Sequence, residues 1–294
     1  PEAPLDMPRQ PLHARLMPLR EDAGGRRRLG LALIRTFLLC AAAALSAYGI
    51  REMYAVMEIG GMVGLQWVFL VLFGINFTWI SLSAVQSLFG FLRIVATDLG
   101  LRSPPQGAEL PTRRVAVLMP VYNEDPNHVA ASLHAMTEEL GKRAPGLFDF
   151  FILSDTTRPD NWIQEEKVFQ ALIRENGKQC PIYYRHRQDN HERKAGNIAD
   201  WVQRWGGAYE SMIVLDADSV MGVDVILKLA TRLEAAPTVG LIQTLPTIVN
   251  GRSVYARLQQ FANRCYGPIF GNGLAIWHGL SSNFWGHNAI IRLQ

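Results

Sequence analysis

Two aspartates, one residue apart, follow a short apolar run and could bind a metal ion. The run is 213–215, and the acids are Asp216 and Asp218. A β-branched apolar run of this kind predicts a buried parallel strand, and ligands of open α/β sheets bind beyond the carboxyl ends of such strands. Carboxylates there suit a hard divalent cation whose oxygen shell a substrate diphosphate completes. Asp is also common in ordinary turns, so the pair taken alone favours a turn.

Polar side chains follow three other predicted strands in the same way. These strands are 115–119, 148–153 and 181–184. The polar residues at their ends or in the loops after them are Tyr122, Glu124, Asp155 and Lys194. Each has an ordinary alternative, such as a turn cap or a solvated charge. Because the carboxyl ends of parallel strands share one edge, the joint pattern predicts a single crevice that these residues line.

The segments around these strands predict an α/β fold. Helical patterns cover 127–140, 194–205 and 223–235, and a further strand is expected at 239–244. Strands that alternate with helices predict a doubly wound, mostly parallel sheet. No G-x-G-x-x-G follows the first strand, which argues against a dinucleotide-binding unit.

The N-terminal third has a different character. Residues 1–28 are rich in proline and charge, and they predict a disordered basic tail. Two apolar stretches lie within 29–92, and each is long enough to cross a bilayer as a helix. Arg35 is the only charge in the first stretch and is expected to reach towards the lipid headgroups. A linker at 93–113 leads into the α/β domain, 114–294.

Charge and composition limit the location and the partners. Arginines flank the outer ends of the two spans, so the positive-inside rule places the N-terminus and the α/β domain in the cytoplasm. The net charge of +3 is too small to suggest a nucleic-acid partner. Cys40, Cys180 and Cys265 are scattered, which argues against a disulfide framework or a metal cluster. His186 and His191 are expected to be exposed loop histidines.

Five short motifs carry a family resemblance. They are Pro120-x-Tyr122-Asn-Glu124, Ser154-Asp155, Lys194-Ala-Gly-Asn197, Asp216-Ala-Asp218 and Gln243-Thr-Leu-Pro246. In this order they resemble those of processive family 2 glycosyltransferases of the GT-A fold, the class that contains cellulose and hyaluronan synthases. The segments 150–160 and 284–292 are more specifically similar to the bacterial glucosyltransferases that make osmoregulated periplasmic glucans.

The resemblance implies a role for each candidate residue. The residues implied in binding the donor, UDP-glucose, are Tyr122, Glu124, Asp155, Lys194 and Asp216. Asp216 and Asp218 are implied as ligands of Mg²⁺ or Mn²⁺. The residues implied in gating or in binding the β-glucan acceptor are Gln243, Thr244, Pro246, Trp285 and His287. The helix at 254–266 resembles an amphipathic helix at the membrane interface, and a core-packing helix is an equal alternative.

The resemblance also implies a setting and partners. The protein is expected to be a multi-pass protein of the bacterial inner membrane that exports its glucan. Its implied partners are the lipid bilayer, an acyl carrier protein and a periplasmic glucan-processing protein.

One chemical group is missing from the chain. An inverting transfer needs a general base for the acceptor hydroxyl, but no carboxylate follows Glu234. The earlier acids are assigned to the donor, so no catalytic residue is expected here and the base is expected beyond Gln294, in a longer protein. Two classes of function stay open: an inverting glucosyltransferase, or an inactive module that binds a sugar nucleotide as a sensor or scaffold. A synthase of cellulose or hyaluronan type is the alternative enzyme.

Overall fold

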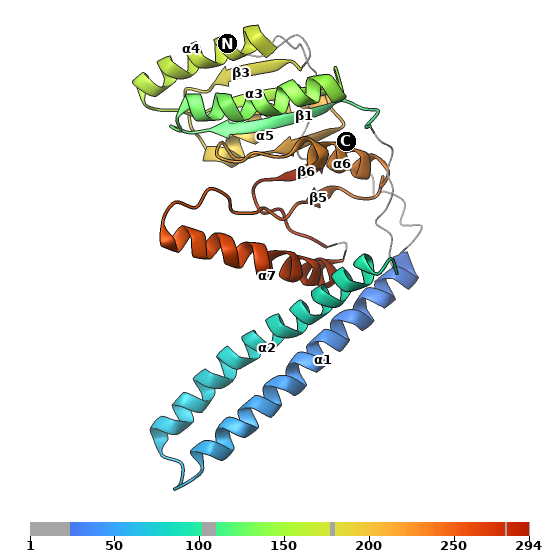
Figure 1. Cartoon of the computed structure of the whole chain (residues 1–294), viewed down its shortest axis with the longest axis vertical. Coiled ribbons are helices and arrows are strands. Elements are labelled where there is room, and N and C mark those ends of the chain that lie inside the picture. The colour runs from blue at the N-terminus through green and yellow to red at the C-terminus, as the bar shows by residue number, and fades with distance from the viewer. Residues whose placement is uncertain (1–23, 102–109, 177–179, 280, 294) are drawn as a thin grey trace. The chain divides into compact units, whose positions relative to one another are not determined.

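The computed structural model describes residues 24–101, 110–176, 180–279 and 281–293 (Figure 1). The chain forms two compact units. The α/β unit holds the described residues of 105–244 and 283–294, and the helical unit holds those of 18–104 and 245–282. The division differs from the expected domain 114–294, because residues 245–282 group with the apolar helices.

The described part of the α/β unit has a six-stranded, mixed sheet with the order β3-β2-β1-β4-β6-β5. The strands are β1 (Val115–Val121), β2 (Phe148–Ser154), β3 (Ile182–His186), β4 (Ser211–Val214), β5 (Leu241–Gln243) and β6 (Ala289–Arg292). The pairs of β1 with β2, β1 with β4, and β2 with β3 are parallel, whereas β6 runs antiparallel to both β4 and β5. The predicted doubly wound, mostly parallel sheet is confirmed.

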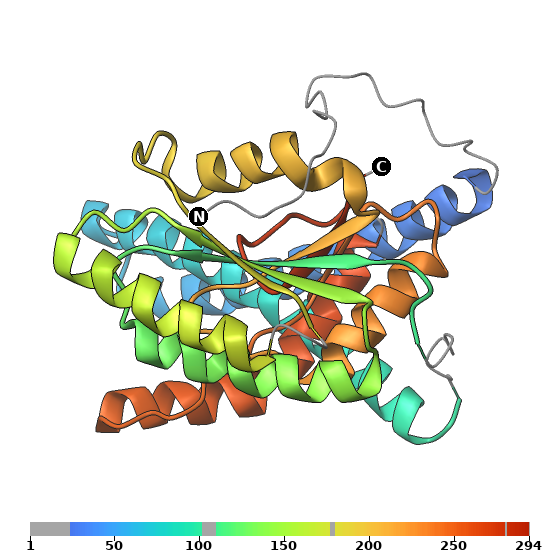
Figure 2. The ribbon, with the colours of Figure 1, turned by 90° about the horizontal axis from the view of Figure 1, so that it is seen from above.

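Helices cover both faces of this sheet. The helices of the unit are α3 (Pro126–Arg143), α4 (Pro159–Asn176), α5 (Arg193–Trp205) and α6 (Val223–Glu234). Side chains of α3, α4 and α6 pack on one face, and those of α5 pack on the other. Figure 2 shows α5 on one side of the sheet, with α3 and α4 on the opposite side. Strand residues alternate between the two cores as the period of two requires: Val117 and Met119 face α3, whereas Ala116 and Leu118 face α5.

Two elements of this unit were not predicted. The helix α4 lies between β2 and β3, and β6 pairs with β4 and β5 near the end of the chain. The predicted strand at 239–244 shortens to β5, which is three residues long and reaches the sheet only through β6.

Three long helices make up the described helical unit. They are α1 (Gly24–Met57), α2 (Gly64–Asp98) and α7 (Val254–His278). The predicted tail therefore ends earlier than expected, since 24–28 are helical, and the predicted linker starts later, since α2 continues through Asp98. The rest of the tail, 1–23, and residues 102–109 of the linker lie outside the described residues.

Two of these helices are long and apolar enough to cross a membrane, at Leu29–Met57 and Gly64–Asp98. Only 17% of the most apolar window in each is buried. A core helix of a soluble protein buries most of its apolar surface, so this exposure favours a lipid environment.

Helix α7 crosses α2 at two glycines. A Cβ added to Gly90 would lie 2.0 Å from the Ile269 carbonyl oxygen, and one added to Gly273 would lie 2.2 Å from the Gln86 carbonyl oxygen. Small residues allow such close approach between helix backbones. The end of α7 is held by Arg35 of α1, which donates to the carbonyl oxygens of Trp277 at 2.9 Å and His278 at 3.0 Å. Arg35 therefore has protein partners, and its expected reach towards the lipid headgroups stays a prediction.

Candidate active site

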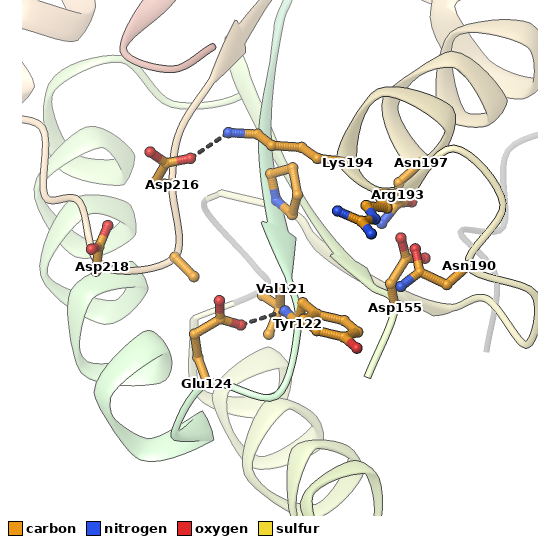
Figure 3. A pocket seen from close by; sticks show the side chains of 12 residues that line it. Val121, Tyr122, Glu124, Asp155, Asn190, Arg193, Lys194, Asn197, Asp216 and Asp218 are labelled. Carbon is orange, nitrogen blue, oxygen red and sulfur yellow. Dashed lines mark hydrogen bonds and ion pairs between the residues drawn. The ribbon is translucent and has the colours of Figure 1, made fainter. Parts of the chain in front are cut away.

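A cavity of about 650 Å³ lies beyond the carboxyl ends of β1, β2 and β4, beside the first turn of α5 (Figure 3). Its lining residues are Pro120, Val121, Tyr122, Glu124, Asp155, Asn190, Arg193, Lys194, Asn197, Asp216, Ala217 and Asp218. The predicted convergence is therefore found: the six residues expected at the strand ends, from Tyr122 to Asp218, all line one cavity.

Asp216 and Asp218 occupy one side of the cavity, on the loop that follows β4 (Figure 3). Asp216 pairs with the Lys194 ammonium, which also donates to the Gly286 carbonyl oxygen at 2.7 Å. Asp218 is exposed and has no hydrogen-bond or ion-pair partner among the described residues.

The donor set of this corner suits a hard cation, because it offers carboxylate oxygens and no sulfur. Within the described ranges, no group of three or more His, Cys, Asp or Glu residues could hold a metal by itself. A divalent ion bound by Asp216 and Asp218 would therefore need oxygen ligands from water or from a bound substrate.

Tyr122 and Glu124 follow β1 and lie across the cavity from Lys194 (Figure 3). The Tyr122 ring is 52% exposed, so one face is open to a ligand. The Glu124 carboxylate accepts a hydrogen bond from the Tyr122 backbone N–H. Burial raises the pKa of Glu124 above its ordinary value, and the nearby Glu165 and Asp218 add to this effect.

Asp155 is buried at 4% exposure and is held by an arginine that the sequence analysis did not identify. Arg187 donates from Nε and Nη2 to the two Asp155 carboxylate oxygens, each at 2.9 Å. Such a bidentate pair fixes the plane of the carboxylate. Arg187 also donates to the Arg193 carbonyl oxygen at 3.2 Å, which links Asp155 to the start of α5.

The first turn of α5 explains the spacing of the Lys194-Ala-Gly-Asn197 motif. The chain enters the helix through two left-handed residues, Glu192 at φ 57° and Arg193 at φ 51°. This brings the preceding loop against the helix, where a Cβ on Gly196 would lie 2.2 Å from the His191 carbonyl oxygen. Asn197 is buried and donates to the Leu153 carbonyl oxygen at 2.9 Å, so the turn is fixed to the end of β2.

Asn190 and Arg193 also line the cavity and were missed. Their signal in the sequence is their position in the charged and polar run 185–194, which leads to Lys194. His191 is exposed, as expected. His186 is not an exposed loop residue, because it ends β3 and its ring stacks on Trp162 at 5.0 Å.

The residues expected in gating or acceptor binding fall into two groups. Gln243 and Thr244 hold the backbone of 285–288: Gln243 donates to the His287 carbonyl oxygen at 2.9 Å, and Thr244 donates to that of Asn288 at 2.6 Å. The His287 ring nitrogen Nδ1 lies 3.8 Å from an Asp216 carboxylate oxygen. None of the residues expected in this role lines the cavity itself.

The other two residues of this set are Trp285, whose backbone N–H donates to Gln243 Oε1 at 3.2 Å, and Pro246. Trp285 is 40% exposed, and the structure assigns its ring no partner among the described residues. Pro246 belongs to the helical unit.

Comparison with known families gives one match. Residues 116–294 match the model of the family described as glycosyl transferase family 2. The matched range contains every element of the α/β unit from β1 to β6, apart from the first residue of β1, and also α7.

Several curated proteins similar to this chain carry the description "Glucans biosynthesis glucosyltransferase H". The protein from Rhodopseudomonas palustris strain BisA53 is 45% identical over 299 residues, which cover 100% of this chain and 41% of that protein. The protein from Xanthomonas campestris pv. campestris strain B100 is 44% identical over 297 residues, covering 100% of this chain and 46% of that protein. This chain therefore spans less than half the length of these relatives.

Solved structures are more distant. The mannosyltransferase PcManGT from Pyrobaculum calidifontis, solved with GDP-Man and Mn²⁺, is 17% identical with a TM-score of 0.45. The match covers 72% of this chain and 55% of that protein.

Proposed function

Since this chain belongs to glycosyl transferase family 2, we propose that it is the donor-binding part of an inverting β-glucan glucosyltransferase. The donor is UDP-glucose and the product is a growing glucan of the kind that the similar curated proteins are named for. One observation carries the proposal: acidic, basic and aromatic side chains from three strand ends and one helix line a single cavity. Such a set can hold a base, a diphosphate and a cation together.

Within this proposal the cavity has two sides. Tyr122 offers an open ring face for the uracil, and the fixed carboxylate of Asp155 accepts from the uracil or the ribose. Lys194 and Asp216 lie on the phosphate side (Figure 3). When the diphosphate enters, the Lys194 ammonium exchanges part of its contact with Asp216 for a phosphate oxygen.

Asp216 and Asp218 would hold Mg²⁺ or Mn²⁺ on the diphosphate. When bound, this ion stabilises the negative charge that grows on the leaving UDP. The residues of the chain itself orient the donor, and the Lys194 ammonium supplies positive charge beside its phosphates. Orientation of this kind lowers the entropic cost of the reaction.

The base that accepts the acceptor's proton is assigned to residues outside this chain. The acids of the cavity are Glu124, Asp155, Asp216 and Asp218. Asp155 and Asp216 are engaged by Arg187 and Lys194, and Asp218 is assigned to the metal. Glu124 accepts from the Tyr122 backbone N–H and is assigned to the donor. The similar curated proteins are more than twice as long as this chain, which leaves room for the base.

We also propose that α1 and α2 cross the bacterial inner membrane, with both chain ends on the cytoplasmic side. Their length, hydropathy and exposed apolar surface support this placement. UDP-sugars are cytosolic, so this orientation puts the cavity where its donor is found. Export of the glucan, and binding of an acyl carrier protein and a periplasmic glucan-processing protein, belong to the same proposal.

Replacing Asp218 with Asn tests the metal assignment. In the full-length protein, D218N removes one anionic ligand and leaves Asp155 and Lys194 in place. We expect the rate of metal-dependent UDP release to fall by about 100-fold or more. The cation stabilises the leaving UDP only when its carboxylate ligands hold it in position. Calorimetry should show weaker Mn²⁺-dependent UDP binding.

Asp160→Asn is the matched control, because Asp160 is an exposed aspartate outside the cavity. Unchanged turnover in D218N would show that Asp218 is not a ligand of the catalytic cation. A screen of UDP-sugars tests the donor, and a preference for a sugar other than glucose would contradict that part of the proposal.

The same cavity supports an alternative proposal, an inactive module that binds a sugar nucleotide without transferring the sugar. Saturable UDP binding by the full-length protein without any glucan synthesis would support a sensor or scaffold that holds a sugar nucleotide.

A further inference from the structure

A buried carboxylate lies next to the cavity but does not line it. Glu165, on α4, has an exposed fraction of 0%. Its oxygens accept from three hydroxyl groups: Ser154 Oγ at 2.6 Å, Tyr184 Oη at 3.0 Å and Thr156 Oγ1. No Lys or Arg side chain pairs with it among the described residues. We call Glu165 and these three hydroxyl residues the Glu165 cluster.

This arrangement has no evident benefit for stability. Burying a carboxylate costs free energy that hydroxyl donors only partly offset, and an apolar side chain of similar size would avoid that cost. The cluster instead fixes three segments relative to α4, because each hydroxyl donor comes from a different segment: the end of β2, the loop after it, and β3.

Thr156 connects the Glu165 cluster to the loop after β1. Its hydroxyl, which donates to Glu165, accepts from the Asn123 backbone N–H at 3.0 Å. Asn123 has a left-handed backbone with φ 62°, which costs energy in a residue other than glycine. Its side-chain oxygen accepts from the backbone N–H groups of Thr157 at 3.3 Å and Arg158 at 3.1 Å. Asn123 is therefore fixed to the β2 loop on both its backbone and its side chain.

A third contact with Thr156 comes from His186, at the end of β3. His186 Nε2 lies 2.9 Å from the Thr156 carbonyl oxygen, and the His186 ring stacks on Trp162 of α4 with an interplanar angle of 9°. Thr156 is thus held by its hydroxyl from α4 and the β1 loop, and by its carbonyl oxygen from β3. Thr156 directly follows Asp155, and Asn123 lies between Tyr122 and Glu124.

We propose that Glu165 is a positioning residue for the donor's base. Through Thr156 and Asn123, the Glu165 cluster sets the separation between the loop carrying Tyr122 and Glu124 and the loop carrying Asp155. That separation determines how a flat nucleoside base fits between the Tyr122 ring and the Asp155 carboxylate. The inference rests on the proposed function, because it concerns the nucleoside side of the same cavity.

The test compares two ligands on the purified full-length protein with Mn²⁺. UDP contacts both sides of the cavity, whereas inorganic pyrophosphate contacts only the side of Lys194 and Asp216. In E165Q an amide replaces the carboxylate, so one of the acceptors becomes a donor that faces hydroxyl groups. We expect UDP affinity by calorimetry to fall about tenfold, the scale of one hydrogen bond to a charged group. Pyrophosphate affinity should stay within about twofold of wild type.

Two further variants keep the test decisive if E165Q folds poorly. T156V removes the hydroxyl link and keeps the side-chain shape, whereas T156S retains the hydroxyl. We expect T156V to repeat the selective loss of UDP affinity, and T156S to bind UDP as wild type does. E166Q is the matched control, because Glu166 is the next residue of α4 and bonds only to the Trp162 ring N–H at 3.3 Å among the described residues.

The outcomes separate the inference from the proposed function. If the wild type binds neither UDP nor pyrophosphate, the proposed function fails. If the wild type binds both, and E165Q or T156V lowers both affinities equally or lowers neither, Glu165 is a structural residue and the inference is overturned. A higher KM for UDP-glucose in E165Q, with kcat little changed at saturating donor, would lower kcat/KM and agree with a positioning role.

Discussion

At the scale of single residues, the cavity contains one cation that no acid neutralises within the described parts of the chain. Lys194 pairs with Asp216, and Arg187 pairs with Asp155. The Arg193 side chain also lines the cavity, and it has no side-chain partner among the described residues (Figure 3). A guanidinium suits a diphosphate because its donors match the phosphate oxygens. Arg193 is therefore the group that can bind a phosphate without first giving up an ion pair.

Replacing Arg193 with Ala should weaken binding of the phosphates specifically. We expect the affinity for pyrophosphate with Mn²⁺ to fall about tenfold, which is the scale of one charge-assisted contact. Isothermal titration of the purified protein measures this loss.

The control for this change is Arg174→Ala, which removes the same charge from an exposed position near the end of α4. Equal affinities in R193A and R174A would show that Arg193 does not contact the phosphates, and would leave Lys194 as the cation for this role.

At the scale of elements, the start of α5 is the most constrained part of the site. The loop before it contains two consecutive left-handed residues, and the helix accepts this loop only because Gly196 has no side chain. Asn197 then fixes the turn to β2, and Lys194 enters the cavity from the same turn. The order of residues in the motif 194–197 thus has a local explanation: Gly196 leaves space for the loop, and Asn197 bonds the turn to β2.

Gly196→Ala should therefore disturb the site more than a usual Gly-to-Ala change in a helix. The added methyl meets the His191 carbonyl oxygen at 2.2 Å and the Glu192 Cβ at 2.8 Å. We expect a loss of stability of about 1–3 kcal/mol, the usual scale for overpacking, and weaker UDP binding. Thermal unfolding and calorimetry measure the two effects.

Gly222→Ala is the comparison for this change. A Cβ on Gly222 meets nothing within 4 Å, and its φ of −60° suits any residue. A G196A protein as stable as G222A would mean that the loop moves away at little cost.

At the scale of the whole molecule, the chain passes from one unit to the other more than once. Helix α7 belongs to the helical unit, yet the chain before it ends β5 and the chain after it leads to the 285–288 segment and β6. The choice between a membrane-interface helix and a core-packing helix at 254–266 stays a prediction. Gly273 of α7 contacts α2 closely, while Tyr255, Leu258 and Phe261 are exposed.

Arg35 is the residue of α1 that holds the end of α7, and its loss should loosen that end. In Arg35→Met the last carbonyls of α7 lose two donors that also complement the helix dipole. We expect amide hydrogen exchange at 275–279 to become faster, with exchange in the middle of α2 unchanged. Mass spectrometry of the detergent-solubilised protein measures both regions.

Arg51→Met on the same helix is the matched change, because Arg51 has no hydrogen-bond or ion-pair partner among the described residues. If R35M and R51M exchange alike at 275–279, Arg35 does not hold the helix end.

Much of the fold followed from local patterns. Short apolar runs identified β1, β2 and β4, and the polar residues after them identified the cavity. Helix α4 was missed because its buried stripe of Glu165, Phe169 and Leu172 contains a carboxylate, which hides the apolar period. Strand β6 was missed because its pairing with β4 joins residues about 80 positions apart in the chain, such as Ser211 and Arg292.

The side chains at the strand ends could be deduced from the sequence, because the direction of a parallel sheet brings all its carboxyl ends to one edge. Tyr122, Asp155 and Asp216 converge for that reason. The partners that hold these groups are visible only in the folded chain: Arg187 pairs with Asp155, and Glu165 binds the Thr156 hydroxyl below the loop. These partners come together when separate elements pack. The hydrophobic periodicity within one element therefore cannot predict the contact between them.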